Sequence, residues 1–230
     1  MNVLFSNNLD NQSAAGVYTS VQEAHTHQTS IYRSVVKRAI DMLFVIAALP
    51  IVLPTVLMMA LMVALDGHNP VYRQKRIGLG GRTFTMWKLR TMVPDADKLL
   101  ETHLAKNEFA RAEWDKTQKL KEDPRITALG KFLRKSSLDE LPQLWNVLKG
   151  DMSLVGPRPM LPEQKPMYPG QCYYALRPGI TGLWQVSERN QSSFADRAKF
   201  DTIYNRSLSL KTDVTVLWAT VGVVLRGTGY

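Results

Sequence analysis

Met42–Leu65, with the sequence MLFVIAALPIVLPTVLMMALMVAL, is the stretch that decides how this chain folds, because none of its 24 residues is charged. Asp41 precedes the stretch and Asp66 follows it. At about 1.5 Å per residue, an unbroken helix of this length would extend about 36 Å, more than the roughly 30 Å of a bilayer's hydrocarbon core. We therefore expect this segment to insert into a membrane.

Two features of the segment argue against a simple crossing. Pro50 and Pro54 lie in its middle, and each removes a backbone hydrogen bond from a helix at a cost of about 3 kcal/mol. Both flanks are basic, with Arg33, Lys37 and Arg38 before the segment and Arg73, Lys75 and Arg76 after it. A re-entrant helix that breaks near Pro54 and returns to the same face fits both features. A complete crossing stays an alternative, whereas a signal peptide is disfavoured because no small-residue cleavage pattern follows Leu65.

The composition of the 230 residues restricts the classes of function. Cys172 is the single cysteine, which excludes an internal disulfide and suits a reducing compartment. The four histidines lack metal-ligand spacing, so a zinc site is not expected. With 29 basic and 20 acidic residues, the net charge of +9 indicates an anionic partner: nucleic acid, anionic lipid or a phosphorylated substrate. Few aromatic residues lie between the basic ones, which argues against nucleic acid.

The chain divides into three expected parts. Residues 1–33 are polar without a hydrophobic period and are expected to be a disordered tail. Residues 34–66 form the membrane helix, and residues 67–230 form the domain at the cytoplasmic face. We expect an α+β fold, a small and mostly helical domain with a short β-hairpin and interfacial helices.

Local patterns predict the elements of this domain. Val71–Met92 is predicted to be a hairpin that turns at its glycines. Helices are predicted over 95–121 (one or two), 126–135, 137–149 and 193–204, with ordered loops over the proline-rich 151–185. Val214–Leu225 is too short to span a membrane, and we expect it to be a core helix or one that lies in the interface, anchored by Trp218.

The predicted hairpin concentrates positive charge, with six cations and no acid between Tyr72 and Met92. Lys88 and Arg90 are two residues apart, so on a strand they would project from the same face. Such a patch can bind a phosphorylated substrate or simply the headgroups of an anionic bilayer.

Ser137-Leu138-Asp139-Glu140 is the sharpest local motif. Ser137 followed three residues later by Glu140 is the capping-box pattern, which predicts a helix that starts here and ends at Gly150. Two adjacent carboxylates would then lie at the positive end of the helix dipole, although plain capping is the commoner explanation of such a pattern when it stands alone.

A rigid cation follows the motif, because Arg158 stands between Pro157 and Pro159. A carboxylate that attacks a diphosphate must overcome repulsion between anions. Mg²⁺ bound by carboxylates and by the substrate's phosphates would relieve most of it, with Arg158, Lys88 or Arg134 adding fixed charge.

Taken together, these pieces resemble the bacterial sugar transferase family, the monotopic polyprenyl-phosphate hexose-1-phosphate transferases, over about residues 34 to 230. The matching stretches are Lys37-Arg38 with Asp41, Arg76-Ile77-Gly78 with Phe84, Lys88-Leu89-Arg90-Thr91-Met92, Asp123-Pro124-Arg125-Ile126-Thr127, Leu133-Arg134, Ser137-Leu138-Asp139-Glu140-Leu141-Pro142-Gln143, Gly150 to Pro159, and Arg177-Pro178-Gly179-Ile180-Thr181-Gly182. One departure is Leu53-Pro54 at the helix break, where many relatives carry Ser-Pro.

The resemblance implies a function and a site. Asp139 would attack the sugar-bearing phosphate of a UDP-sugar and release UMP, and undecaprenyl phosphate would then take the hexose phosphate from the enzyme in the first step of exopolysaccharide assembly. Asp139 and Glu140 would bind Mg²⁺, with Glu140 the main ligand. Arg158, Lys88, Arg134 and Arg90 would bind phosphate or support the site, and Pro54 and Pro50 would break the membrane helix.

The resemblance also implies where the protein works and with what. It places the chain at the cytoplasmic face of the bacterial inner membrane, in contact with an anionic bilayer and not with nucleic acid, and it is compatible with a homodimer. The exopolysaccharide-priming branch suggests UDP-galactose or UDP-glucose as the donor. Asp201 and Asp213 match acidic positions of the family without an assigned role. Two other functions stay open, a membrane-surface module that binds polyanions and a hydrolase of polyprenyl diphosphates.

Overall fold

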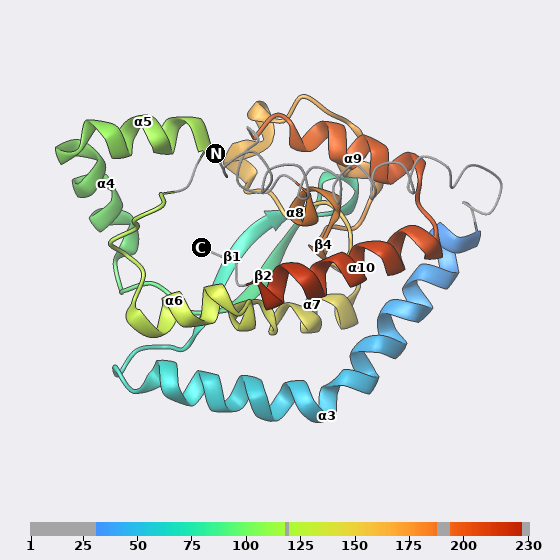
Figure 1. Ribbon diagram of the computed structural model, residues 1–230, viewed down its shortest axis with the longest axis horizontal. Helices are drawn as coiled ribbons and strands as arrows, with labels where there is room; N and C mark the ends of the chain where they lie inside the picture. Colours follow the sequence, from blue (N-terminus) through green and yellow to red (C-terminus); the bar gives the residue numbers. More distant parts are fainter. Residues whose placement is uncertain (1–30, 118–119, 188–193, 227–230) are drawn as a thin grey trace, which may run out of the picture.

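The computed structural model describes residues 31–117, 120–187 and 194–226, and its architecture is α+β and mostly helical, as expected (Figure 1). The predicted tail up to residue 30 lies outside the described residues, as does Ser193 at the start of one predicted helix. Residues 31–33 are helical, so the first helix begins before the predicted boundary at residue 34.

The predicted hairpin is present. β1 (Val71–Ile77) pairs antiparallel with β2 (Thr83–Leu89), with the first residue of β1 opposite the last of β2. Gly80 and Gly81 both have positive φ in the connecting turn, a conformation that side chains other than glycine rarely adopt. The second strand ends earlier than predicted, and Met92 takes part only in an isolated bridge.

The charged region after the hairpin forms two helices, α4 (Ala96–Lys106) and α5 (Glu108–Thr117), which lie to one side of the molecule in Figure 1. α6 (Ala128–Lys135) follows them and begins with a side-chain cap. The hydroxyl of Thr127 accepts a hydrogen bond of 2.9 Å from the backbone N–H of Gly130.

The predicted helix over 137–149 is divided in two. Ser137 has a left-handed backbone (φ 58°) and makes no side-chain cap, so the capping box that we predicted is wrong. A single 3-10 turn, η3 (Leu138–Glu140), comes first, and α7 (Gln143–Lys149) starts after it. The reason is Pro142, which fits the start of a helix but not its interior. Gly150 ends α7 with φ 89°, as predicted.

The proline-rich region contains regular pairing that its sequence did not indicate. β3 (Ser153–Val155) pairs parallel with β4 (Gly179–Thr181). The two glycines beside these strands permit close approach of backbones, since a Cβ built on Gly179 would lie 2.1 Å from the nitrogen of Gly156. The other short elements are η4 (Pro162–Met167), η5 (Cys172–Ala175) and α8 (Leu183–Val186).

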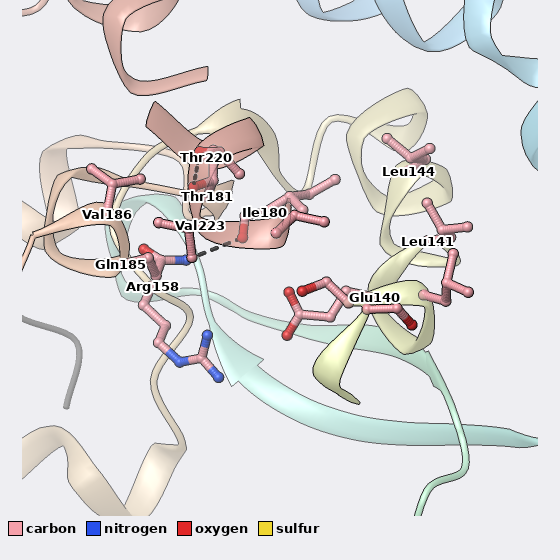
Figure 2. Close-up of a pocket in the computed structure, with 14 residues that line it drawn as sticks. Glu140, Leu141, Leu144, Arg158, Ile180, Thr181, Gln185, Val186, Thr220 and Val223 are labelled. Atoms are coloured by element: carbon pink, nitrogen blue, oxygen red, sulfur yellow. Dashed lines mark hydrogen bonds between the residues drawn. The ribbon is translucent and has the colours of Figure 1, made fainter. Parts of the chain in front are cut away.

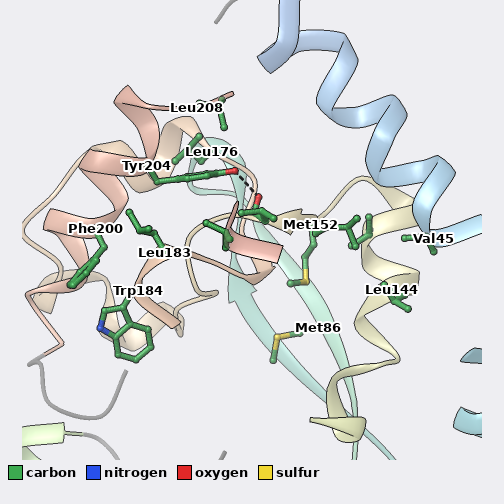
Figure 3. Close-up of a cluster of buried hydrophobic side chains, with 14 of the residues drawn as sticks. Val45, Met86, Leu144, Met152, Leu176, Leu183, Trp184, Phe200, Tyr204 and Leu208 are labelled. Atoms are coloured by element: carbon green, nitrogen blue, oxygen red, sulfur yellow. Dashed lines mark hydrogen bonds between the residues drawn. The ribbon is translucent and has the colours of Figure 1, made fainter. Parts of the chain in front are cut away.

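Two helices complete the domain, α9 (Arg197–Arg206) and α10 (Leu210–Leu225). The main core lies between these helices, the hairpin, α7 and the β3–β4 pair, and Figure 3 shows Met86, Met152 and Tyr204 within it. α10 buries Val216 completely and leaves Trp218 79% exposed. Val216 thus places one side of α10 in the core, whereas the exposed Trp218 would suit a boundary between lipid and water, so the position of this helix in an interface stays a prediction.

The N-terminal apolar segment is helical throughout. A turn of π-helix, η1 (Tyr32–Val36), leads into α3 (Lys37–Ala64), which continues through Pro50 and Pro54. The helix bends instead of breaking, and Figure 1 shows the change of direction within α3. Among the described helices, this one alone is long and apolar enough to cross a membrane, and most of its surface is not covered by protein.

Both ends of α3 are bonded to the domain. Near the N-terminus, Arg38 donates to the carbonyls of Val147 and Leu148 at the end of α7, the second at 2.8 Å. Beyond the C-terminus, Arg90 lies 2.6 Å from the Asp66 carboxylate and also donates to the carbonyl of Val63 at 3.2 Å. Cations at helix C-termini satisfy free carbonyls and oppose the helix dipole.

Asn146 joins α7 to the hairpin. Its side chain is fully buried, donates to the carbonyl of Thr85 at 2.7 Å and accepts from the backbone N–H of Trp87 at 3.1 Å. These two bonds hold the outer edge of β2 against α7, and therefore hold the end of β2 close to the turn η3 that precedes α7.

We predict that Asn146→Ala destabilises the protein by about 2 kcal/mol or more, because two buried backbone groups of β2 lose their partner. For a domain of this size the melting temperature in detergent should fall by about 4 to 8 °C. Lys149→Ala on the same helix is the control, since its ion pair with Asp151 is exposed and contributes little. Equal melting temperatures for Asn146→Ala and Lys149→Ala would show that this joint does not stabilise the fold.

Candidate active site

The two carboxylates of the motif lie in the turn η3, between α6 and α7. Asp139 is 6% exposed, whereas the side chain of Glu140 is partly exposed at the edge of a groove. Ser137 precedes them in its left-handed conformation, one of two non-glycine residues with positive φ in the described chain. Backbone strain of this kind is typical of functional sites and is retained only where the surrounding structure enforces it.

Lys88 reaches the carboxylates from the neighbouring strand. Its ammonium group lies 2.6 Å from Glu140 Oε1 and 3.9 Å from Asp139 Oδ2. Lys88 is the next-to-last residue of β2, so the hairpin places its ammonium group beside the two carboxylates. The structure thus places Lys88, which the resemblance assigned to phosphate binding or to support of the site, beside the two acids.

Arg134 is held near Asp139 by the end of the hairpin. The guanidinium donates through Nε to the hydroxyl of Thr91 at 2.9 Å, and α6 packs so closely here that a Cβ on Gly130 would lie 2.0 Å from the Thr91 carbonyl oxygen. Burial lowers the pKa of Arg134, and its charge acts on Asp139.

Asp139 is a strongly perturbed acid. Burial raises its pKa above the usual value, and the charge of Glu140 acts in the same direction. The charges of Lys88, Arg134 and Arg158 oppose this rise, with Lys88 the largest of the three. The carboxylate is therefore poorly solvated but surrounded by cations, an arrangement often found for catalytic acids.

Arg158 lies on the loop that follows β3, and hydrogen bonds hold this loop on two sides. Gly179 N–H donates to the Pro157 carbonyl at 2.8 Å, and Arg76 donates to the Pro159 carbonyl at 3.0 Å. Figure 2 shows the guanidinium of Arg158 and the carboxylate of Glu140 at the same opening. No residue in the described ranges hydrogen-bonds this guanidinium, so its donors remain available to a ligand.

Two further arginines belong to this region, and the sequence reasoning did not assign them to it. Burial and the charge of Arg158 lower the pKa of Arg76 to about 10 and that of Arg197 to about 9. Arg197 also stacks on Trp184 at 4.3 Å from the ring centroid. The Nε of each arginine is buried without a hydrogen-bond partner in the described structure. Arg76 stands in a motif quoted above, whereas no local pattern marks Arg197.

Arg90 lies apart from the two acids. Its contacts are with Asp66, the carbonyl of Val63, and the backbone of Asn69 and Met92. The structure therefore brings together Asp139, Glu140, Lys88, Arg134 and Arg158, and it places Arg90 at the end of the membrane helix.

Asp139 and Glu140 are the carboxylates of this site that could contribute ligands to a metal ion. Within the described residues, no group of three or more His, Cys, Asp or Glu side chains lies close enough to bind a metal. Asp139 and Glu140 supply two neighbouring carboxylates. Mg²⁺ commonly takes one or two carboxylates together with substrate phosphates, so this pair fits the ion in the presence of a diphosphate.

The acidic residues near the C-terminus have structural partners. Asp213 accepts hydrogen bonds from Tyr32 and Tyr204, and it pairs with Lys37 at 2.6 Å, which connects α10 to the start of α3. Asp201 accepts from Tyr168 at 2.7 Å, and burial raises its pKa to about 7. Neither carboxylate is bonded to the residues around Asp139.

The sequence model of the bacterial sugar transferases matches residues 32–227, which include every residue of this site. The chain belongs to the bacterial sugar transferase family. The matched residues include the apolar helix α3, the buried Asp139 and the cations around it. The resemblance drawn from the motifs is therefore confirmed.

Curated relatives of this sugar transferase act in related processes. It is 46% identical over 195 residues to a UDP-galactose-lipid carrier transferase of Erwinia amylovora and to an undecaprenyl-phosphate galactose phosphotransferase of Salmonella typhimurium. These matches cover 84% of the chain but only 41% of either relative, so the chain spans about two-fifths of their length. The exopolysaccharide production protein ExoY of Sinorhizobium fredii is 43% identical over 196 residues, which are 84% of this chain and 87% of that protein.

Proposed function

We propose that the protein transfers hexose-1-phosphate from a UDP-sugar to a polyprenyl phosphate, giving polyprenyl diphosphate-sugar and UMP. The observation that carries the proposal is the buried Asp139 beside Glu140, with Lys88, Arg134 and Arg158 around the pair. Family membership and the relatives named for lipid-carrier galactose transfer support the same reaction.

The reaction proceeds in two displacements at phosphorus. A carboxylate oxygen of Asp139 attacks the sugar-bearing phosphorus of the UDP-sugar, the bond to the bridging oxygen breaks, and UMP leaves with that oxygen. The sugar phosphate is then held as a mixed anhydride on Asp139. An oxygen of polyprenyl phosphate attacks the same phosphorus, the bond to Asp139 breaks, and the carboxylate is regenerated.

The surrounding charges make an anionic nucleophile usable against an anionic substrate. Lys88 keeps the two carboxylates together, and Arg158 presents free donors to the phosphates. Mg²⁺, with Asp139 and Glu140 as its protein ligands, would neutralise phosphate charge when bound. Arg76 and Arg197 add positive charge near Arg158.

We further propose that α3 is re-entrant and that the domain lies at the cytoplasmic face of the bacterial inner membrane. The two ends of α3 bond to the same domain, through Arg38 at one end and Arg90 at the other. A helix with ends on opposite faces would separate these two contacts by the thickness of the bilayer. The bend at Pro50 and Pro54 supports the proposal, since it lets both ends approach the domain.

The donor is proposed to be UDP-galactose or UDP-glucose, and the product to start an exopolysaccharide. The names of two relatives point to galactose, and that of ExoY points to exopolysaccharide. Hydrolysis of polyprenyl diphosphates is the competing reaction at the same site, and release of inorganic phosphate from a polyprenyl diphosphate, without transfer from any UDP-hexose, would favour it.

We expect purified protein with Mg²⁺, undecaprenyl phosphate and a panel of UDP-hexoses to release UMP with one sugar preferred. Asp139→Asn should lower this rate by at least about 10³-fold without loss of folding, because the amide is a poor nucleophile. Asp115→Asn on the exposed face of α5 is the control and should keep full activity. Normal turnover by Asp139→Asn would exclude Asp139 as the nucleophile.

The pH dependence should report the ionisation of Asp139, because only its carboxylate attacks. Lys88 lowers the pKa of Asp139, so Lys88→Met should raise that pKa and move the acid limb of kcat/KM to higher pH. At neutral pH the rate should fall by about a hundredfold. Lys75→Met, an exposed position on β1, provides the control profile. An acid limb that stays at the same pH in Lys88→Met would contradict this electrostatic role.

A further inference from the structure

We propose that the groove beside Glu140 binds the first isoprene units of the acceptor lipid, an inference that rests on the proposed function. The groove has a volume of about 370 Å³ and lies between η3, α7, β4, α8 and α10. Its walls are mostly apolar, and Figure 2 shows their side chains on the two sides of the opening. The apolar lining residues are Leu138, Leu141, Leu144, Ile180, Val186, Val223 and Val224.

The groove combines mostly apolar walls with two charged residues at its edge. Glu140 and Arg158 lie at its edge, where the sugar phosphate would be transferred. A molecule that fills the groove with its chain would therefore present its head to Arg158 and to the phosphorus bound on Asp139. Of the two proposed substrates, the UDP-sugar carries no hydrocarbon part, whereas a polyprenyl phosphate joins an apolar chain to one anionic group.

The helices around the groove also carry exposed apolar side chains. α10, which forms one wall, exposes Trp218 at 79% and Leu225 at 82% on its other side. α7, which forms the opposite wall, exposes Trp145, and the neighbouring α6 exposes Phe132. Apolar side chains in such numbers on the helices around one groove indicate contact with a membrane. A chain much longer than the groove can then continue into the bilayer without entering water.

Occupation of the groove positions the acceptor and adds little affinity. The prenyl chain comes from a bilayer that is as apolar as Val223 or Leu144, so its transfer into the groove gains little hydrophobic free energy. What it gains is a fixed distance between the lipid phosphate and Asp139. Misplacement of a reacting group by about 1 Å can cost roughly a hundredfold in rate. Filling the groove should therefore slow the second displacement and leave the first unchanged.

The test compares two Val→Trp substitutions on α10. Val223→Trp fills the groove, whereas Val214→Trp adds the same bulk at an exposed position on the same helix. The first displacement is measured as a single burst of UMP from the UDP-hexose without acceptor. The second displacement is measured as kcat/KM for two acceptors, undecaprenyl phosphate and farnesyl phosphate. The short chain of farnesyl phosphate would lie within the groove without extending beyond it.

For Val223→Trp, we expect a normal burst and a fall of about tenfold or more in kcat/KM for both acceptors, with Val214→Trp close to the wild type in every assay. An unchanged kcat/KM for farnesyl phosphate in Val223→Trp would overturn the proposal, as would an equal loss of burst and transfer. Absence of a UMP burst in the wild type would instead contradict the proposed function itself, so the two failures are distinguishable.

Discussion

The electrostatic problem at Asp139 determines most of this structure. A carboxylate that is to attack a phosphate must be ionised, yet burial favours its protonated form and Glu140 beside it adds to the repulsion. Lys88, Arg134 and Arg158 oppose this rise in the pKa of Asp139 in part, and each comes from a different part of the chain. The fold brings strand β2, helix α6 and the loop after β3, which carry these three cations, to the short turn η3 that carries Asp139 and Glu140.

Each of these parts is held in place by hydrogen bonds. Asn146 fixes β2 against α7, Thr91 receives Arg134, and the parallel pair β3–β4 fixes the loop of Arg158. Glycines at the points of closest approach leave no space for a side chain. The membrane helix is bonded to the same scaffold at both of its ends. The packing of α3 on the domain therefore fixes the position of the site relative to this apolar helix.

Local patterns in the sequence were sufficient to locate several elements and the two neighbouring carboxylates of the candidate site. The apolar segment, the glycine turn of the hairpin and the pair Asp139-Glu140 are each marked within a few neighbouring residues. The capping box was wrong because the left-handed Ser137 makes no side-chain cap and Pro142 separates the two acids from α7. Arg90 could not be placed from its spacing to Lys88, because β2 ends at Leu89 and the next residue turns towards α3.

The features that the sequence did not reveal are formed by contacts between segments that lie far apart in the sequence. The strands β3 and β4 have three residues each, too few for a pattern, and they pair over a long loop. Arg197 joins the site through the packing of α9 on Trp184, which no spacing predicts. The groove beside Glu140 is likewise formed by helices and a strand from separate parts of the chain.

The most direct measurement is the mass of the protein after incubation with Mg²⁺ and the preferred UDP-hexose, without acceptor lipid and with an acid quench. The account predicts that the chain gains one hexose phosphate, that the peptide containing Asp139 carries it, and that undecaprenyl phosphate removes it. UMP formed while the protein remains unmodified, or a hexose phosphate attached to another residue, would contradict the account.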